Sequence, residues 1–178
     1  EEIPNAVPTA TQNGYFIFLA EPTVVTTGGL ISPCDWRSGR AKRTCRSTLS
    51  GETQAVDAGL DAALHIRQLL AEVLIEHYLP GRDRCPPADF FRIIQTTDCK
   101  SLFDTLTKEG APTLPTEKRL AIDLAALADV PLEYGWTVQD LYRWIPTDLQ
   151  LADHLTKMKP TDGLRDLLTA GRCRLFQA

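Results

Sequence analysis

The sequence predicts a mixed α/β fold in which a sheet is covered by helices. Two apolar, strand-like stretches come first, a long stretch of helical periodicity follows, and shorter strand and helix patterns then alternate. With 178 residues, of which 43% are hydrophobic and 24% charged, the chain has the size and composition of one globular domain. We expect this domain to span residues 13–158, after an irregular lead-in over 1–12 and before a helical extension over 159–178.

The first half of the chain predicts a hairpin and a long helix. Gly14–Ala20 is rich in aromatic and β-branched residues, and a Gly28-Gly29 turn leads to a second strand over Leu30–Trp36. The helix runs over Leu49–Tyr78, where apolar residues recur at three- and four-residue intervals, and ends at Pro80-Gly81. Three polar residues at its start can act as its cap: Ser47, Thr48 and Ser50.

The second half alternates between short strands and helices. Phe90–Thr97 has the pattern of a buried strand, and Ser101–Lys108 resumes helical periodicity. A further helix starts near Thr116 and ends at Pro131, and Thr137–Ile145 is an exposed strand or a loop. Two short helices complete the chain: Leu149–Met158 and Asp162–Leu168.

Composition limits the possible functions. The net charge is -4 and the sequence pI is about 5.4, so contact with nucleic acid would have to come from a local basic patch. The longest apolar run, Tyr15–Ala20, is far shorter than the about 20 residues that cross a bilayer as a helix, and we expect a soluble, intracellular protein without a membrane partner. The cysteines are odd in number and irregularly spaced, which predicts free thiols: Cys34, Cys45, Cys85, Cys99 and Cys173.

Three acidic residues lie where predicted elements begin or end: Glu52, Asp98 and Asp153. Glu52 lies in the first turn of the long helix and shares a face with Val56 and Leu60. Asp98 directly follows a strand, at the carboxyl end where ligands collect in α/β sheets. Carboxylates that converge on one sheet edge repel each other unless a divalent cation neutralises them, so the pattern predicts a site for Mg²⁺ or Mn²⁺.

Each of these acids also has an ordinary structural explanation. Glu52 could cap its helix or complement the helix dipole, and Asp98 could cap the next helix. Asp153 could form a solvated ion pair with Lys157, one turn further on. The sequence leaves these alternatives open.

A basic run precedes the long helix. The segment Arg37–Arg46 (RSGRAKRTCR) holds five cations among ten residues, directly before Glu52, and predicts a surface that contacts nucleic-acid phosphates. The alternative is a solvated hairpin whose charges protect an edge strand from pairing. The cations are Arg37, Arg40, Lys42, Arg43 and Arg46.

Four motifs occur in a recognisable order. Arg46–Val56 (RSTLSGETQAV) resembles an S-S-T-E-A-E-Y helix start, and Thr97–Leu102 (TDCKSL) resembles C-D-N-x-S-A. Thr116–Asp123 (TEKRLAID) is similar to T-K-H-I-D-I, and Gln150–Lys157 (QLADHLTK) resembles the signature Q-x-A-D-x-L-T-K. This is the order found in the RNase H-like domain of the Pol polyprotein of copia-type retrotransposons, which the chain resembles from the first strand to about Lys157.

The resemblance implies an RNase H-like mixed sheet flanked by helices, which cleaves the RNA strand of RNA–DNA hybrids during reverse transcription. It places Glu52, Asp98 and Asp153 at catalytic and metal-binding positions, with Mg²⁺ or Mn²⁺ as the cofactor. It also implies the upstream reverse transcriptase domain of the same polyprotein as a partner, and a location in the cytoplasm, the nucleus or the virus-like particle of the element.

The chain departs from the family pattern at its start. The family carries its first catalytic aspartate on a first strand, in an S-D-A-D-like segment, whereas Glu1–Gln12 contains no aspartate and two prolines. Asp35 matches a position on the third strand and cannot replace it, and the W-S-K-K-Q step appears here as Asp35–Arg40 (DWRSGR). We therefore expect an N-terminally truncated domain without its first strand. Either an upstream segment supplies that strand, or the chain is a catalytically inactive remnant that binds nucleic acid or connects other domains.

Overall fold

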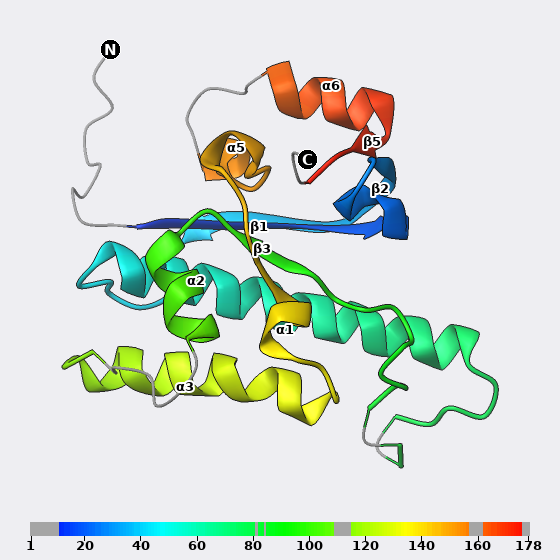
Figure 1. Cartoon of the computed structure of the whole chain (residues 1–178), viewed down its shortest axis with the longest axis horizontal. Helices are drawn as coiled ribbons and strands as arrows, with labels where there is room; N and C mark the ends of the chain where they lie inside the picture. The colour runs from blue at the N-terminus through cyan, green and yellow to red at the C-terminus, as the bar shows by residue number, and fades with distance from the viewer. Residues whose placement is uncertain (1–10, 81, 84, 109–114, 157–161, 176–178) are drawn as a thin grey trace.

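The computed structural model of the chain describes residues 11–80, 82–83, 85–108, 115–156 and 162–175. It confirms the predicted mixed α/β class. Helices α1, α2 and α3 lie below the strands in Figure 1, and α5 and α6 lie above them. The elements are β1 (Gln12–Ala20), a 3-10 turn (Pro22–Val25), β2 (Gly29–Arg40), α1 (Thr48–Leu74), β3 (Gln95–Thr97), α2 (Lys100–Thr107), α3 (Lys118–Glu133), α4 (Val138–Leu141), β4 (Tyr142–Trp144), a 3-10 turn (Thr147–Leu149), α5 (Asp153–Thr156), α6 (Asp162–Ala170) and β5 (Arg172–Cys173).

The described strands form two separate sheets. One has the order β1-β2-β5 and is antiparallel, with the predicted hairpin at its centre and an irregularity in the register between Ile17 and Phe18. The other is a parallel pair, β3 and β4, in which Gln95 lies opposite Tyr142. The single mixed sheet that the resemblance implies is therefore divided in two within the described residues.

Helix α1 packs against both sheets. A Cβ atom at Gly59 would lie 3.1 Å from Cβ of Tyr15 on β1 and 3.8 Å from Nε2 of Gln95 on β3. Glycine at this position thus allows α1 to approach β1 closely, and a larger residue would require a small shift of Tyr15. An adjacent face of α1 joins a core shared with α2, α3, α4 and β4, which consists of Val56, Leu60, Leu102, Leu106, Leu120, Leu124, Leu127, Trp136, Leu141 and Tyr142.

The ends of α1 have local causes. The Ser47 side chain accepts a hydrogen bond from the backbone N–H of Ser50 (3.1 Å), which makes Ser47 the N-cap, one of the three predicted candidates. At the other end, Ile75 leaves the helix in an extended conformation, so the helix ends four residues before the predicted end at Tyr78. His77 then adopts a positive φ of 66°, so the chain turns before it reaches Pro80.

Arg67 of α1 holds the loop that precedes β3. Its side chain is buried, and its Nε donates to the carbonyls of Phe90 (2.8 Å) and Phe91 (3.1 Å). Its Nη2 donates to the carbonyls of Pro86 and Pro87. Four carbonyls of this loop thus accept from one side chain, and Phe91 has a positive φ of 41°, which is not a strand conformation. The strand predicted over Phe90–Thr97 is wrong in its extent, since β3 has three residues.

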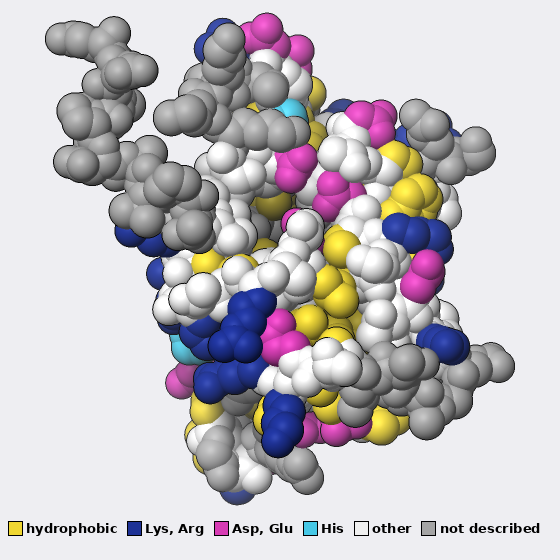
Figure 2. Space-filling view, turned by 90° about the vertical axis from the view of Figure 1, so that its left-hand side faces the viewer, with side chains coloured by type: hydrophobic (Ala, Val, Ile, Leu, Met, Phe, Trp, Pro, Cys, Tyr) yellow, Lys and Arg dark blue, Asp and Glu magenta, His cyan; other side chains and the backbone are white. Residues whose placement is uncertain are grey.

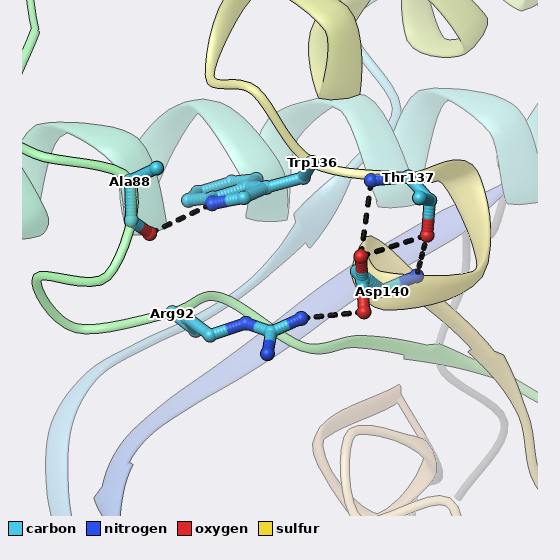
Figure 3. Close-up of polar contacts among 5 residues, drawn as sticks. All are labelled: Ala88, Arg92, Trp136, Thr137 and Asp140. Atoms are coloured by element: carbon cyan, nitrogen blue, oxygen red, sulfur yellow. Dashed lines mark hydrogen bonds and ion pairs between the residues drawn. The ribbon is translucent and has the colours of Figure 1, made fainter.

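We call the Arg67 side chain and the loop carbonyls that it binds the Arg67 clamp. Aromatic rings and a second set of polar contacts lie beside it. The Arg67 guanidinium carbon lies 5.4 Å from the ring centroid of Tyr134 and 5.0 Å from that of Trp136. Trp136 in turn donates from Nε1 to the Ala88 carbonyl (2.8 Å), as Figure 3 shows. In the same view Arg92 pairs with Asp140, whose carboxylate also accepts from Thr137 in a capping box at the start of α4.

Helix α3 continues two residues past its predicted end at Pro131. A proline inside a helix has no N–H to donate to the carbonyl four residues earlier, which here belongs to Leu127. The buried Tyr142 hydroxyl donates to that carbonyl instead (2.7 Å). Burial raises the pKa of Tyr142 well above its ordinary value, followed by a smaller effect of Asp57. The hydroxyl thus stays protonated and keeps the helix intact across the proline.

The C-terminal segment packs with the hairpin. Strand β5 was not predicted, and it pairs with the start of β2, where Gly29 lies opposite Cys173 and Leu30 opposite Arg172. Helix α6 precedes it, at the position expected for the second short helix. Residues 157–161 and most of the lead-in over 1–12 lie outside the described residues.

All five cysteines are described and free. In the described part of the chain, no helix has the length and apolar character to cross a bilayer.

We expect Arg67→Met to lower the free energy of unfolding by about 3 kcal/mol, because it leaves buried carbonyls without a donor. Urea denaturation measures this change. Arg92→Met is the matched control, since it removes an ion pair of half-exposed side chains and should cost less than about 1 kcal/mol. Equal losses for the two variants would contradict the importance of the buried clamp.

Candidate functional site

The three acids predicted from the sequence come from three different elements. Glu52 is the fifth residue of α1, Asp98 directly follows β3, and Asp153 is the first residue of α5. All three side chains are partly buried. Figure 2 shows Asp and Glu side chains around a recess between the upper and lower layers, with a group of Lys and Arg side chains below it.

The pKa of Glu52 links the three acids electrostatically. It is raised, first by burial and then by the negative charges of Asp98 and Asp153. Two residues that are distant from Glu52 in the sequence therefore act on its carboxylate. We refer to Glu52, Asp98 and Asp153 together as the acid cluster.

The structure also tests the ordinary explanations for two of these acids. Ser47 already caps α1, and Glu52 lies beyond the first turn of that helix, so Glu52 is not its cap. The placement of Glu52 in the first turn was wrong because the helix begins one residue earlier than predicted. The N-cap of α2 is Cys99 rather than Asp98.

Asp153 starts a helix of only four residues, and its backbone carbonyl accepts from the hydroxyl of Thr156 (3.1 Å). Asp153 has further interactions in the structure. The alternative partner, Lys157, lies outside the described residues. The ion pair predicted between Asp153 and Lys157 thus stays a prediction.

Helix α5 is held against the hairpin by a close backbone approach. A Cβ atom at Gly14 on β1 would lie 3.0 Å from Cγ2 of Thr156 and 3.5 Å from the carbonyl oxygen of Ala152. The Ser38 hydroxyl on β2 donates to the Leu155 carbonyl. A side chain at position 14 would therefore require Thr156 of α5 or the backbone at Arg37 to shift by a few tenths of an ångström.

A residue that the sequence reasoning did not include in the site supports Asp98. Trp144, at the end of β4, donates from Nε1 to the backbone carbonyl of Asp98 (3.2 Å). Its side chain is 41% exposed, and its ring lies 5.8 Å from Nζ of Lys100. No sequence signal identifies it, because its place depends on the parallel pairing of β3 and β4, which puts Trp144 opposite Thr97, next to Asp98.

The acid cluster has donor chemistry that suits a metal ion, but its geometry is open. Carboxylate oxygens are the ligands that Mg²⁺ and Mn²⁺ prefer. Among the described residues, however, no three His, Cys, Asp or Glu side chains lie close enough together to hold a metal ion. The cluster as described is therefore not a closed coordination site.

The predicted basic run divides into two kinds of residue. Arg37 and Arg40 belong to β2, and both are exposed, as are Lys42 and Arg46 in the loop that follows. Arg43 instead forms a two-point contact with Asp123 of α3, at 3.1 and 3.3 Å. Arg43 therefore joins the loop to α3, whereas the four exposed cations are accessible to a ligand.

Asp35, the acid on the hairpin, lies outside the acid cluster. It is opposite Ile17 in the register of the hairpin, and its carboxylate accepts from the Tyr15 hydroxyl (3.0 Å). That Asp35 does not replace the first aspartate of the family pattern stays a prediction.

We expect the acid cluster to make stability depend on pH. Because the pKa of Glu52 is raised in the folded state, the folded protein binds more protons than the unfolded chain between the two pKa values. The free energy of unfolding therefore falls as pH rises through this interval. Glu52→Gln should match the original chain at low pH and be more stable than it at neutral pH, as measured by chemical denaturation across this range.

The control for this prediction is Asp104→Asn, which removes an exposed carboxylate paired with Lys100. This variant should give no gain in stability at neutral pH. If Glu52→Gln were no more stable than the original chain at any pH, the repulsion among the three acids would be too weak to matter.

Comparison with known proteins assigns no family to the chain. No protein-family model matches its sequence, and no curated protein or solved structure matches it significantly. A functional conclusion must therefore start from the acid cluster, the neighbouring cations and the divided sheet.

Proposed function

We propose that the chain is an RNase H-like domain of a copia-type Pol polyprotein, whose acid cluster takes part in cleaving the RNA strand of RNA–DNA hybrids. The observation that carries the proposal is the shared electrostatics of Glu52, Asp98 and Asp153. A carboxylate that is partly buried and repelled by two further carboxylates costs stability, and such groups are concentrated at functional sites. Their types and order along the chain are those that the resemblance expects.

The divided sheet is consistent with a missing central strand. Strands β1 and β3 both lie on α1 near Gly59, yet each pairs with another strand, β1 with β2 and β3 with β4. The resemblance expects a first strand that carries an aspartate, and a strand inserted between β1 and β3 would join the two sheets into one. We propose that the upstream reverse transcriptase portion of the polyprotein supplies this strand.

The fourth carboxylate on that strand would complete the donor set for Mg²⁺ or Mn²⁺. When bound, such an ion would supply charge neutralisation and an activated water for hydrolysis. The chain's own contribution is the placement of three carboxylates on separate elements, and the Trp144 contact that fixes the backbone at Asp98. The exposed cations would hold the hybrid by its phosphates, without reading its base sequence.

A second candidate function is a catalytically inactive module that binds or connects. The open geometry of the acid cluster favours it, because the described residues contain no group of three side chains that could hold a metal ion. The nuclease and the inactive module would have the same fold and the same exposed cations. They differ only in whether a fourth carboxylate completes the acid cluster as a metal site.

Cleavage of a labelled RNA–DNA hybrid in the presence of Mg²⁺ tests the proposal. We expect cleavage once the chain carries an N-terminal extension with an aspartate on an apolar strand, and we expect Asp98→Asn in that protein to abolish it. Asp104→Asn, on the exposed face of α2, should leave cleavage unchanged. Hybrid binding without cleavage in the extended protein would favour the inactive module, and cleavage unaffected by Asp98→Asn would refute the assigned site.

The exposed cations give a separate prediction for binding. Reversing Arg40 and Arg46 to Glu should weaken hybrid binding and flatten its dependence on salt, by a slope of about 0.9 for each phosphate that is no longer neutralised. Fluorescence anisotropy at several salt concentrations measures this slope. Arg43 is excluded from the test because its replacement would also break the ion pair with Asp123. An unchanged slope would support a merely solvated hairpin.

A further inference from the structure

A pocket of about 380 Å³ lies between the hairpin and α1. Its size is within the range of small-molecule sites, about 300 to 1,000 Å³. Charged side chains of both signs line it. The cations are Arg37, Arg40, Lys42 and Arg43, and the carboxylates are Asp57 and Asp61.

The pocket is separate from the acid cluster. Along an α-helix, Asp57 lies about 140° round the axis from Glu52 and Asp61 lies about 180° round it. Glu52 does not line the pocket, and neither Asp98 nor Asp153 does. The same helix thus presents one acidic side to the cluster and another to the pocket.

Most of the opposite charges that line the pocket are not paired with one another. Arg43 pairs with Asp123, but no ion pair joins Asp57 or Asp61 to Arg37, Arg40 or Lys42 in the described part of the chain. The space between the two sets of charges is therefore open to a ligand that carries both an anionic group and hydrogen-bond donors.

One of the two carboxylates of the pocket, Asp57, is partly desolvated. The pKa of Asp57 is raised, chiefly by burial and then by Asp61 and Asp123, while Arg43 lowers it. A carboxylate removed from water in this way gains most from donors that a ligand brings. Hydroxyl groups are such donors, and phosphate is the matching group for the arginine side.

We infer that this pocket binds a ribonucleotide, with the phosphate on Arg37, Arg40 and Lys42 and the ribose hydroxyls donating to Asp57 and Asp61. A phosphate alone would leave the carboxylates without donors, and a ligand without negative charge would leave the cations without a partner. The ligand is either a free nucleotide or a nucleotide within an RNA strand. The site shares cations with the proposed hybrid-binding surface, and to that extent it rests on the proposed function, but it uses none of the acid cluster.

Isothermal titration calorimetry of the chain with 5′-AMP, 2′,3′-dideoxy-AMP and inorganic phosphate tests this inference. We expect 5′-AMP to bind more tightly than the dideoxy analogue by about tenfold or more, because each missing hydrogen bond to a charged group is costly. Asp61→Asn should remove most of that preference and leave phosphate binding unchanged. Asp61 is exposed, so this variant should fold normally, which circular dichroism checks.

Arg40→Ala should weaken the binding of both nucleotides and of phosphate, whereas Asp104→Asn should change none of them. Equal affinity for 5′-AMP, the dideoxy analogue and phosphate would overturn ribose recognition, and no binding of 5′-AMP at millimolar concentration would overturn the site. Competition of a short oligoribonucleotide with 5′-AMP would identify RNA as a source of the ligand, and a lack of competition would restrict it to free nucleotides.

The inference and the proposed nuclease fail in different ways. Asp98→Asn should leave the binding of 5′-AMP unchanged, because Asp98 lies outside the pocket. If hybrid cleavage is never observed but the ribose preference is, only the nuclease is refuted. If cleavage depends on Asp98 but the ribose preference is missing, only the pocket assignment is refuted.

Discussion

The packing of α1 against two sheets is the constraint on which the rest of the structure depends. Near Gly59 the helix touches β1 on one sheet and β3 on the other, although the two sheets share no strand among the described residues. The same helix contributes Val56 and Leu60 to the core, Glu52 to the acid cluster and Arg67 to the clamp of the following loop. A displacement of α1 would therefore change the fold, the acid cluster and the pocket together.

The acid cluster and the pocket each contain a charged group whose burial lowers the stability of the folded protein. In the cluster, like charges from three elements oppose one another, and burial adds to the effect on Glu52. In the pocket, charges of both signs line one cavity, and the carboxylate of Asp57 is partly desolvated. Burial of a carboxylate, as at Glu52 and Asp57, raises its pKa and costs stability.

Local patterns in the sequence were sufficient for most helices and for the hairpin. Apolar spacing predicted α1, α2 and α3 to within a few residues, and the Gly28-Gly29 turn predicted the connection between β1 and β2. The irregular loop before β3 could not be predicted, because Arg67, which binds its carbonyls, lies 23 residues before Phe90 and nothing in its neighbourhood indicates that it is buried. Strand β5 has two residues and forms only because β2 offers an edge.

The candidate site could be predicted from the sequence only in part. Residue type and position at the ends of elements were enough to select Glu52, Asp98 and Asp153, and the pKa of Glu52 links them electrostatically. The contribution of Trp144 and the pairing of Arg43 with Asp123 depend on contacts across 46 and 80 residues of sequence, which no local pattern carries. The same holds for the pocket, since Asp57 and Asp61 have an ordinary surface spacing on α1.

Strand β4 has only three residues, yet its two ends are fixed to different parts of the molecule. The Tyr142 hydroxyl closes the gap that Pro131 leaves in α3, and the Trp144 indole holds the backbone at Asp98. Opening either contact would loosen the other, because both belong to one short, stiff segment of chain. The last turns of α3 and the backbone beside the acid cluster should thus exchange their amide hydrogens as one cooperative unit.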